Sequence, residues 1–468
     1  MMKTKELIHA LREDNCPLPV YWLWDKDNKP IFLQSLLRNL KDRRATFLAD
    51  DAGQKSIVKL FYHKQGIQHA RREVKGLALL QQCEVPTSEV LHCDVLKEGV
   101  LLMLSYLQDT KPLSACWAKM SDSEKKETLL KLLAELKKLY EKGVYQCDLH
   151  LNNILLNAEE LYMVDGMDVR QPKTTSLSAK LDNLAILFLQ FSFSDQVLLW
   201  QALEDSKISL SSAQLKKHIL AQSLYQQGKI KAKVWRECSR FVTGQLDDYQ
   251  YSVAREKKIA FNQLFEHLKK PKTYCIPLKQ GRTNTVFHYQ YKECNWVVKR
   301  YNIKSLAHGL GRSVRMTRAA VSWQNANILE SLHILTSKPI GILQKKWGSW
   351  RRQAYFVMAY LEGQSLKQYL QTLAEHSERQ HQIIKNVAQT LNALKQNRLC
   401  HGDLKADNWW VCKDKLYLLD LDSLKTYRFG LWFQCAFKRD LKRFLRNWED
   451  MPALQHAFIK IFEENQLL

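Results

Sequence analysis

Residues 400–423 read CHGDLKADNWWVCKDKLYLLDLDS, and the spacing of three polar side chains in this stretch indicates a function. Asn408 follows Asp403 by five positions, and Asp420 follows it by seventeen. The Asp403 carboxylate can accept a proton from an attacking hydroxyl. Asn408 and Asp420 offer oxygen ligands of the kind that Mg²⁺ prefers when it also holds phosphates. Because phosphoryl transfer needs mainly positioning and charge neutralisation, the stretch indicates a phosphotransferase site.

The same skeleton occurs earlier in the chain, at residues 145–168, which read YQCDLHLNNILLNAEELYMVDGMD. Here Asp148, Asn153 and Asp165 repeat the spacing of the later three residues, and the two stretches align without a gap. A spacing of three functional residue types that is repeated in this way predicts two similar domains in tandem.

An amphipathic helix is predicted before the earlier stretch, over residues 121–143. Ser121 and Glu124 form a capping-box pattern at its start, and Gly143 is a stop signal at its end. The leucines that recur at helical spacing, and should therefore be buried along one face, are Leu129, Leu132, Leu133, Leu136 and Leu139.

A similar helix is predicted before the later stretch, over residues 377–397. Ser377 and Gln380 supply the same kind of cap, and Asn397 the same kind of stop. The apolar residues of its buried face are Ile383, Ile384, Val387, Leu391 and Leu394.

Further upstream, each copy has a short β-rich run that ends near a lysine between apolar residues. The runs are SIVKLF, with Lys59, and NWVVKRY, with Lys299. Each copy thus has a strand with lysine, a helix, further strands, a long helix and the Asp-Asn-Asp loop. The basic stretch FEHLKKPKTYCIP around Pro271 is the predicted junction, which gives a first domain at 1–265 and a second at 272–468.

The order of a strand lysine, HGDLKxxN and an apolar strand ending in Asp resembles the protein-kinase-like fold. The loop reads His-Gly-Asp without the arginine of protein kinases, and Asp-Leu-Asp stands where those enzymes have Asp-Phe-Gly. Both features are typical of small-molecule and sugar kinases. The resemblance implies an α+β fold class, with a small β-rich N-lobe and a helical C-lobe in each domain.

The segment RAAVSWQNANILESLHILTSKPIG, residues 318–341, is more specific. Its Trp-x-Asn-Ala helix and Thr-x-x-Pro turn resemble bacterial lipopolysaccharide core kinases, which phosphorylate heptose or Kdo sugars. This resemblance implies a tandem, two-domain member of that family. It would be an ATP- and Mg²⁺-dependent kinase that phosphorylates a sugar hydroxyl of the lipopolysaccharide inner core.

The resemblance also assigns roles to individual residues. Asp403 and Asp148 are implied to be the catalytic bases, and Asp422 is a possible extra support for the metal. The implied metal ligands are Asn408, Asp420, Asn153 and Asp165. The implied nucleotide-binding residues are Lys299, Gly281 in the shortened phosphate-covering loop KQGRTNTVF at 279–287, Lys59, and Glu73, which is placed to pair with Lys59.

Each copy departs from the family pattern. No acidic residue lies between Lys299 and Glu330, so the usual Lys–Glu ion pair is not expected there, and only Gln324 or Asn325 offers a weak substitute. In the first copy, the presumed phosphate-covering loop at 36–49 has no glycine, which makes a close approach of the backbone to phosphates harder. We nevertheless expect catalysis in both copies.

Two conspicuous features receive structural interpretations. His401 is expected to pack under the Asp403 loop and brace it, rather than to act as a second base. Trp409 and Trp410 are adjacent in a predicted strand, so they face opposite ways and at most one is exposed. Core packing is therefore expected in preference to base stacking.

The composition bounds the partners and the location. The 468 residues carry a net charge of +23, which favours a nucleic acid, an anionic membrane surface or a phosphorylated substrate. No nucleic-acid recognition motif is visible, so lipopolysaccharide core or a related anionic sugar is expected, with docking on an anionic membrane. The eleven cysteines form no CxxC pair, which favours reduced thiols and no zinc site.

Residues 1–16 do not form the pattern of a signal peptide, because charges interrupt their apolar residues. The longest apolar stretches, GVLLMLSYL and LAILFLQF, are about half of the ~20 residues that a membrane-spanning helix needs. A cytoplasmic protein, peripheral on the inner face of the bacterial inner membrane, is therefore expected.

Two other functions remain open at this stage. One is a different small-molecule kinase, of the aminoglycoside or choline type, which shares the His-Gly-Asp loop. The other is a pseudokinase scaffold that binds partners and transfers nothing, because the kinase-like fold also hosts inactive relatives.

Overall fold

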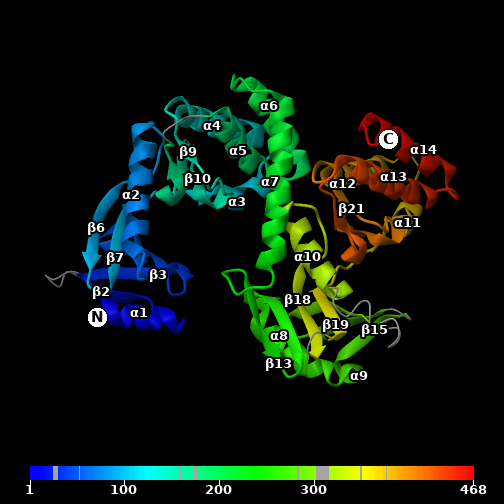
Figure 1. Cartoon of the computed structure of the whole chain (residues 1–468), viewed down its shortest axis with the longest axis horizontal. Coiled ribbons are helices and arrows are strands. Elements are labelled where there is room, and N and C mark those ends of the chain that lie inside the picture. The colour runs from blue at the N-terminus through cyan, green and yellow to red at the C-terminus, as the bar shows by residue number, and fades with distance from the viewer. Residues whose placement is uncertain are drawn as a thin grey trace. The chain divides into compact units, whose positions relative to one another are not determined.

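The computed structural model of the chain describes residues 1–24, 30–51, 53–158, 160–172, 176–281, 284–301, 316–347, 350–375 and 377–468. Residues 282–283 of the predicted phosphate-covering loop lie outside these ranges. The chain forms two compact units (Figure 1). The first comprises Met1–Gln190 and Asp195–Ile219, and the second comprises Phe191–Ser194 and Leu220–Leu468.

The first unit begins with a seven-stranded sheet that positions Lys59. Helix α1 (Thr4–Arg12) packs Leu7 and Leu11 against Val58 and Leu60 of β5. Because side chains alternate along a strand, Lys59 points to the opposite face, where α2 (Gly66–Gln82) lies. The strand order is β1 (Met2–Lys3), β2 (Val20–Leu23), β3 (Pro30–Leu40), β4 (Arg44–Asp51), β5 (Gln54–Phe61), β7 (Gly99–Ser105) and β6 (Val90–Leu96).

Helices and two small sheets follow. The predicted helix is α4 (Asp122–Glu141), which buries all five predicted leucines. Ser121 and Glu124 form the predicted capping box, and Gly143 follows the helix with a left-handed φ of 67°. The other elements are α3 (Leu113–Cys116), α5 (Leu177–Phe188), α6 (Phe193–Asp205), α7 (Ser212–Lys233), the pair β9 (Tyr145–Gln146) and β12 (Val169–Arg170), and the sheet β8 (Lys111–Pro112), β10 (Ile154–Leu156) and β11 (Leu161–Met163).

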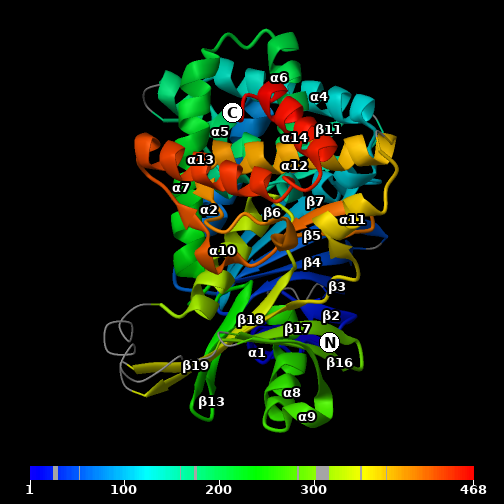
Figure 2. The same ribbon diagram turned by 90° about the vertical axis from the view of Figure 1, so that its right-hand side faces the viewer.

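The second unit repeats this plan. Helix α8 (Lys258–Leu268) packs Phe261 and Leu264 against Trp296 and Val298 of β17, so Lys299 points to the opposite face. Helix α10 (Arg318–Ser331) lies beside β17, β18 and β19 (Figure 2). The strand order is β13 (Phe241–Leu246), β14 (Tyr249–Ala254), β18 (Pro339–Trp347), β19 (Trp350–Ala359), β17 (Cys294–Tyr301), β16 (Asn284–Tyr291) and β15 (Cys275–Gln280).

The helical part of the second unit is built around aromatic side chains. Phe444 contacts the rings of Trp409, Trp448 and Phe458, with centroid distances of 5.9, 5.8 and 5.0 Å. Trp409 is fully buried, as predicted. The elements are α11 (Leu366–Gln371), α12 (Glu378–Gln396), α13 (Gly430–Arg446), α14 (Pro452–Glu464), the pair β21 (Leu399–Cys400) and β24 (Lys425–Thr426), and the sheet β20 (Gln364–Ser365), β22 (Trp409–Cys412) and β23 (Lys415–Leu418).

The two units share one topology. The order β3-β4-β5-β7-β6 in the first sheet corresponds to β15-β16-β17-β19-β18 in the second, and each sheet is followed by a helical part. The predicted α+β class, with two β-rich and helical domains in tandem, is confirmed. No helix in the described ranges is long and apolar enough to cross a membrane.

The division of the chain differs from the predicted junction around Pro271. It falls at Ile219–Leu220, within α7, and Pro271 begins the short helix α9 (Pro271–Tyr274) inside the second unit. The hairpin of β13 and β14 joins the second sheet through β18, and α8 covers the same sheet. Residues 241–268 therefore fold with the second unit, and the basic, proline-containing composition around Pro271 marks a surface segment and not a linker.

Candidate active site

In the second unit, Lys299 is held by two aspartates from the turn after β23. Its Nζ lies 2.6 Å from Asp420 Oδ1 and 3.9 Å from Asp422 Oδ2. Burial alone would lower the pKa of the Lys299 ammonium, but Tyr301 and Asp420 outweigh it, and this pKa is raised. Burial would raise the pKa of Asp420, but the Lys299 charge lowers it, and the net pKa is lowered. Both groups of the Lys299–Asp420 pair are therefore charged at neutral pH.

The loop that carries Asp403 is fixed to the Asp420 turn. The Asn408 side-chain amide donates to the backbone carbonyl of Asp403 at 2.7 Å. The backbone amide of Leu419 donates to the Asn408 carbonyl at 2.8 Å. Asp403, Asn408 and Asp420 are thus brought together, as their spacing predicted.

Two cations flank the Asp403 carboxylate. Arg443 Nη2, from α13, lies 2.6 Å from Asp403 Oδ1, and Lys405 Nζ lies 3.3 Å from Oδ2. Both cations are about half exposed. They hold the carboxylate in one orientation and leave positive charge beside it for an anionic acceptor.

His401 packs against the Asp403 loop and fixes its backbone, as predicted. It is fully buried, its Nε2 lies 2.8 Å from the Leu419 carbonyl oxygen, and the Asp403 amide donates to its Nδ1 at 3.3 Å. These contacts assign the proton to Nε2. Gly402 has a φ of 78°, and a side chain there would lie 2.7 Å from the Ser423 carbonyl oxygen, so only glycine fits.

The acid missing from α10 is supplied by Asp422. Its carboxylate is 4% exposed and lies 2.6 Å from Arg318 Nη2. Burial and the neighbouring Asp420 charge raise the pKa of Asp422. Asp422 thus pairs with Lys299 in place of the usual glutamate, although the sequence predicted it only as extra support for a metal.

The position of the usual glutamate can be identified by matching the two units. Thr87 and Thr336 make the same hydrogen bond, to the carbonyls of Met163 and Leu418, and Glu73 and Ser322 each lie fourteen positions before these threonines. Ser322 therefore replaces the glutamate. Its hydroxyl pairs with the Tyr301 hydroxyl at 2.9 Å, beside the strand that carries Lys299.

Gln324 and Asn325, the weak substitutes considered for the glutamate, make other contacts. Gln324 donates to the Lys231 carbonyl at 3.1 Å. The buried Asn325 amide donates to the carbonyls of Leu421 and Leu424 at 2.8 and 2.9 Å. Asn325 therefore fixes the backbone of the Asp420–Asp422 turn and does not contact the lysine.

In the first unit the predicted Lys59–Glu73 ion pair is present. Lys59 Nζ lies 2.6 Å from Glu73 Oε1 and 3.9 Å from Asp165 Oδ1. Arg44, which the sequence reading missed, lies 3.8 Å from each of the two carboxylates. Burial raises the pKa of the fully buried Glu73, against the Lys59 charge. Burial would also raise the pKa of Asp165, but Lys59 and Arg44 lower it overall.

The Asp148 loop repeats the geometry of the second unit. The Asn153 amide donates at 3.2 Å to both the carbonyl and a carboxylate oxygen of Asp148. Gln146 stands where the second unit has His401. It accepts from the Asp148 amide at 3.3 Å and donates to the Asp165 carbonyl at 3.2 Å. A neutral amide thus replaces the imidazole as a combined donor and acceptor.

A cavity of about 630 Å³ opens between the sheet and the helical part of the first unit. It contains both ends of the candidate site, Lys59 and Asp148. Its apolar side chains suit a nucleobase and its basic side chains suit phosphates. The apolar side chains of the lining include Leu37, Ile57, Leu104 and Leu155, and the basic ones include Arg38, Arg44 and Lys59.

The donor set fits Mg²⁺. Asp165 Oδ1 is buried and accepts no hydrogen bond within the described ranges. Asn153 and Asn408 use their amide nitrogens on the aspartate loops, which leaves their side-chain oxygens available. Mg²⁺ sites that also hold phosphates use only one or two protein carboxylates, and each loop offers such a set.

Gly281 directly follows β15. Its amide donates to the Asn284 carbonyl at 2.9 Å in the turn between β15 and β16. Asn284 pairs with Tyr301, so Gly281 lies beyond the Tyr301 end of β17. A role for this turn at phosphates stays a prediction.

Three residues of the second site were not identified from the sequence. Lys405 has a local signal, because it follows Asp403 by two positions. Arg318 and Arg443 have none, since they come from the first turn of α10 and from the helix α13, far along the chain. Only folding brings these arginines to Asp422 and Asp403.

Comparisons with known families agree with this geometry. Residues 266–462 match the lipopolysaccharide kinase (Kdo/WaaP) family, and residues 41–182 match the RIO domain, which is protein-kinase-like. No curated protein matches the chain. The predicted resemblance is confirmed: the chain carries two kinase-like domains in tandem, and the second is similar to lipopolysaccharide kinases.

Proposed function

From the premise of two kinase-like domains in tandem, we propose an ATP- and Mg²⁺-dependent kinase that phosphorylates a sugar hydroxyl of the lipopolysaccharide inner core. The observation that carries the proposal is the site of the second domain. There Lys299 and Asp420 form an ion pair of 2.6 Å beside the Asp403–Asn408 loop. This site lies within the residues that match the lipopolysaccharide kinase family.

Each residue has a role in this proposal. Asp403 orients the acceptor hydroxyl and takes its proton, and Asp148 does the same in the first domain. Lys299 and Lys59 neutralise phosphate oxygens of ATP. Asn408 with Asp420, and Asn153 with Asp165, would hold Mg²⁺, which supplies further charge neutralisation when bound. Glu73 orients Lys59, and the turn at Gly281 covers the phosphates.

The cations around Asp403 favour an anionic acceptor over a neutral one. Arg443 and Lys405 neutralise more than the single Asp403 charge, and both remain about half exposed. Inner-core sugars carry carboxylate or phosphate groups that would complement this excess.

An exposed apolar cluster supports docking on a membrane. Phe429, Leu431 and Trp432, at the start of α13, are 74%, 77% and 73% exposed. Single exposed apolar side chains are common on soluble proteins, but three together mark an interaction surface. A tryptophan in such a cluster is suited to the interface between lipid and water.

The charges around this cluster specify the partner. Arg428 is adjacent to it. Lys438 and Arg439 follow Leu431 and Trp432 by seven residues, about two helical turns, and so lie on the same sides of α13. An apolar tip with flanking cations complements an anionic bilayer. Arg443 lies twelve residues from Leu431, about 18 Å along the helix, so docking would bring Asp403 near the membrane surface. This placement suits an acceptor anchored in the inner leaflet of the bacterial inner membrane.

The acceptor class is tested by incubating the full chain with Mg²⁺ and γ-labelled ATP. The acceptors compared are deacylated lipopolysaccharide core, an aminoglycoside, choline and casein. Label on the core alone supports the proposal. Label on the aminoglycoside or choline would replace it with a soluble small-molecule kinase, and label on casein with a protein kinase. Binding of Mg-ATP without transfer to any acceptor would favour the scaffold.

A further inference from the structure

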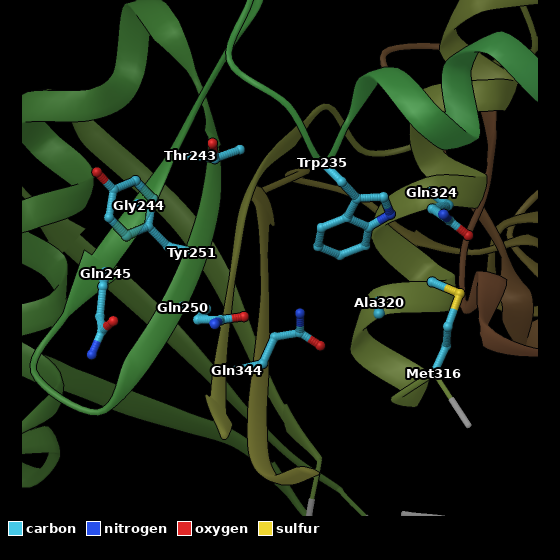
Figure 3. A pocket seen from close by; sticks show the side chains of 10 residues that line it. All are labelled: Trp235, Thr243, Gly244, Gln245, Gln250, Tyr251, Met316, Ala320, Gln324 and Gln344. Atoms are coloured by element: carbon cyan, nitrogen blue, oxygen red, sulfur yellow. The ribbon is translucent and has the colours of Figure 1, made fainter. Parts of the chain in front are cut away.

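A second cavity, of about 730 Å³, lies in the second unit outside the candidate active site (Figure 3). One wall is the sheet edge formed by β13, β14 and β18, and the other is α10. None of the residues discussed above that hold Asp403 or Lys299 lines it. The proposed phosphotransferase reaction therefore gives this cavity no role.

Glutamine side chains cross the sheet wall in one row. Gln245 pairs with Gln250 between β13 and β14, and Gln250 pairs with Gln344 between β14 and β18. Residues that are directly opposite in antiparallel strands share one face, so these side chains stand side by side. Such a row presents donors and acceptors at close, regular spacing.

Of the three glutamines, Gln245 already donates to the Asp247 carbonyl at 2.8 Å, and only one has no partner for its amide within the described ranges. The side chain of Gln250 makes no hydrogen bond there. Gln344 is 7% exposed, and its Oε1 accepts from Thr317 at 3.1 Å, which leaves its amide hydrogens for a ligand. The exposed amide of Gln250 and the amide hydrogens of Gln344 are therefore available for hydrogen bonds with a polar molecule.

Trp235 provides an apolar platform. Its indole is half-buried and stacks on no other ring in the part of the chain described. Figure 3 shows the indole and the amides of Gln250 and Gln344 directed into the same space. An aromatic face beside a row of amides offers both stacking and hydrogen bonds to one ligand.

The described residues that line the cavity are uncharged, in a chain with a net charge of +23. Among the described residues that line the cavity, none is a lysine, arginine, histidine or carboxylate. Among these residues, a phosphate or carboxylate ligand would find no countercharge, and an ammonium ligand would find no carboxylate. The ligand that fits is neutral, rich in hydroxyl groups and apolar on one face.

We propose that this cavity binds a neutral saccharide, with one sugar ring on Trp235 and its hydroxyls on the amides of Gln250 and Gln344. This site is separate from the Asp403 site that receives the acceptor hydroxyl. It would select a chain by its neutral sugars, whereas the active site selects by anionic groups.

Helix α10 joins the two sites. Met316, at its N-terminal end, and Ala320 and Gln324 recur every four positions and line the cavity. Arg318 and Asn325, on the other side of the helix, contact Asp422 and the Leu421 carbonyl. A saccharide in the cavity therefore contacts the helix that positions the active-site turn.

Saturation-transfer NMR tests the proposal on the full chain without nucleotide, so failure of phosphotransfer does not affect it. The probes are neutral trisaccharides of glucose and of galactose, with adenosine as a competing class. At least one trisaccharide is expected to bind, and Trp235→Ala should lower its affinity about tenfold, whereas Trp235→Phe retains most of it. Gln250→Ala, at an exposed position, should also weaken binding and should not disturb folding.

Tyr225→Ala, at an exposed aromatic of α7, is the matched control and should bind as wild type does. The proposal is overturned if no trisaccharide binds, or if binding is the same in Trp235→Ala and wild type. Binding of adenosine that is lost in Trp235→Ala would also overturn it, because the cavity would then be a nucleobase site separate from the two proposed ATP sites.

Discussion

At the scale of single residues, the strand lysine of the second site, Lys299, pairs with an acid from a different element than Lys59 does in the first site. Ser322 occupies the helix position where the first domain has Glu73, and Asp422 pairs with Lys299 from the turn. Arg318 balances the extra carboxylate at 2.6 Å. The lysine is thus held without any acid on the inner face of α10.

This exchange of partners predicts that the contributions of Asp422 and Arg318 to activity are coupled. Asp422→Asn and Arg318→Gln should each lower kcat/KM for ATP about tenfold, because each leaves the other charge unbalanced beside Lys299. The double variant should be no worse than either single variant. Steady-state kinetics of the wild type, the two single variants and the double variant measures this coupling. Glu330→Gln, at the other end of α10, is the control and should retain activity. Additive losses would show that the two side chains act independently.

The Lys299–Asp420 pair also predicts a pH dependence. The lowered pKa of Asp420 means that its carboxylate stabilises the fold at neutral pH, and that this contribution is lost as pH falls through the folded-state pKa, below about 4. The raised pKa of Lys299 means that its contribution is lost only as pH rises above about 10. The Tm difference between wild type and Asp420→Asn should therefore be constant between pH 6 and 8 and shrink below about pH 4. A difference that disappears near pH 6 would contradict this assignment.

At the scale of elements, the two domains join the helix to the turn that carries Asp165 or Asp420 in different ways. In the first domain, α2 touches the turn directly, and a side chain at Gly76 would lie 1.8 Å from the Gly166 carbonyl oxygen. In the second domain, the residue equivalent to Gly76 is Asn325, whose amide bridges the turn carbonyls. One contact needs the absence of a side chain, and the other needs a specific one.

The close contact predicts a large effect of a single methyl group. Gly76→Ala should destabilise the first domain by about 3 kcal/mol or more, because rigid backbone lies where the methyl group would be. Gly228→Ala is the matched helical control. A side chain there meets nothing within 4 Å, so that variant should be neutral or more stable by about 1 kcal/mol. Thermal unfolding compares the two, and equal Tm values would refute the contact.

Most elements that carry the site could be predicted from local signals. The capping box at Ser121 and Glu124, the leucine spacing of α4 and the lysine strands β5 and β17 follow from short-range patterns that the structure retains. The domain junction could not be predicted in the same way. Whether β13 and β14 join the second sheet depends on pairing with β18, almost a hundred residues later, and no local pattern reports it.

The same limit explains the site residues that were missed. Asp403, Asn408 and Asp420 lie in one short stretch, so their spacing is visible in the sequence. Arg443 reaches Asp403 from α13, which the sequence shows only as a basic amphipathic helix. Contacts between distant elements need the fold before they can be recognised.

At the scale of the whole molecule, the apolar cluster on α13 predicts membrane binding. Replacing Phe429, Leu431 and Trp432 by serine should lower partitioning onto vesicles with anionic lipid at least tenfold, because about 1.5–3 kcal/mol is available for each side chain that is fully buried. Co-sedimentation with vesicles measures it. Ile259→Ser, at an 80% exposed isoleucine of α8, should leave partitioning unchanged. Equal binding to neutral and anionic vesicles would argue against the role of the flanking cations.

The central claim is that the chain transfers phosphate through Asp403 and Asp148. The most direct test is phosphate transfer from ATP to deacylated lipopolysaccharide core by wild type, Asp403→Asn, Asp148→Asn and the double variant, each with an unchanged Tm. Each single substitution should lower the rate of phosphate transfer by its own domain about 10²–10⁴-fold, and the double variant should transfer essentially no phosphate. A folded double variant that phosphorylates the core at the wild-type rate would contradict the claim.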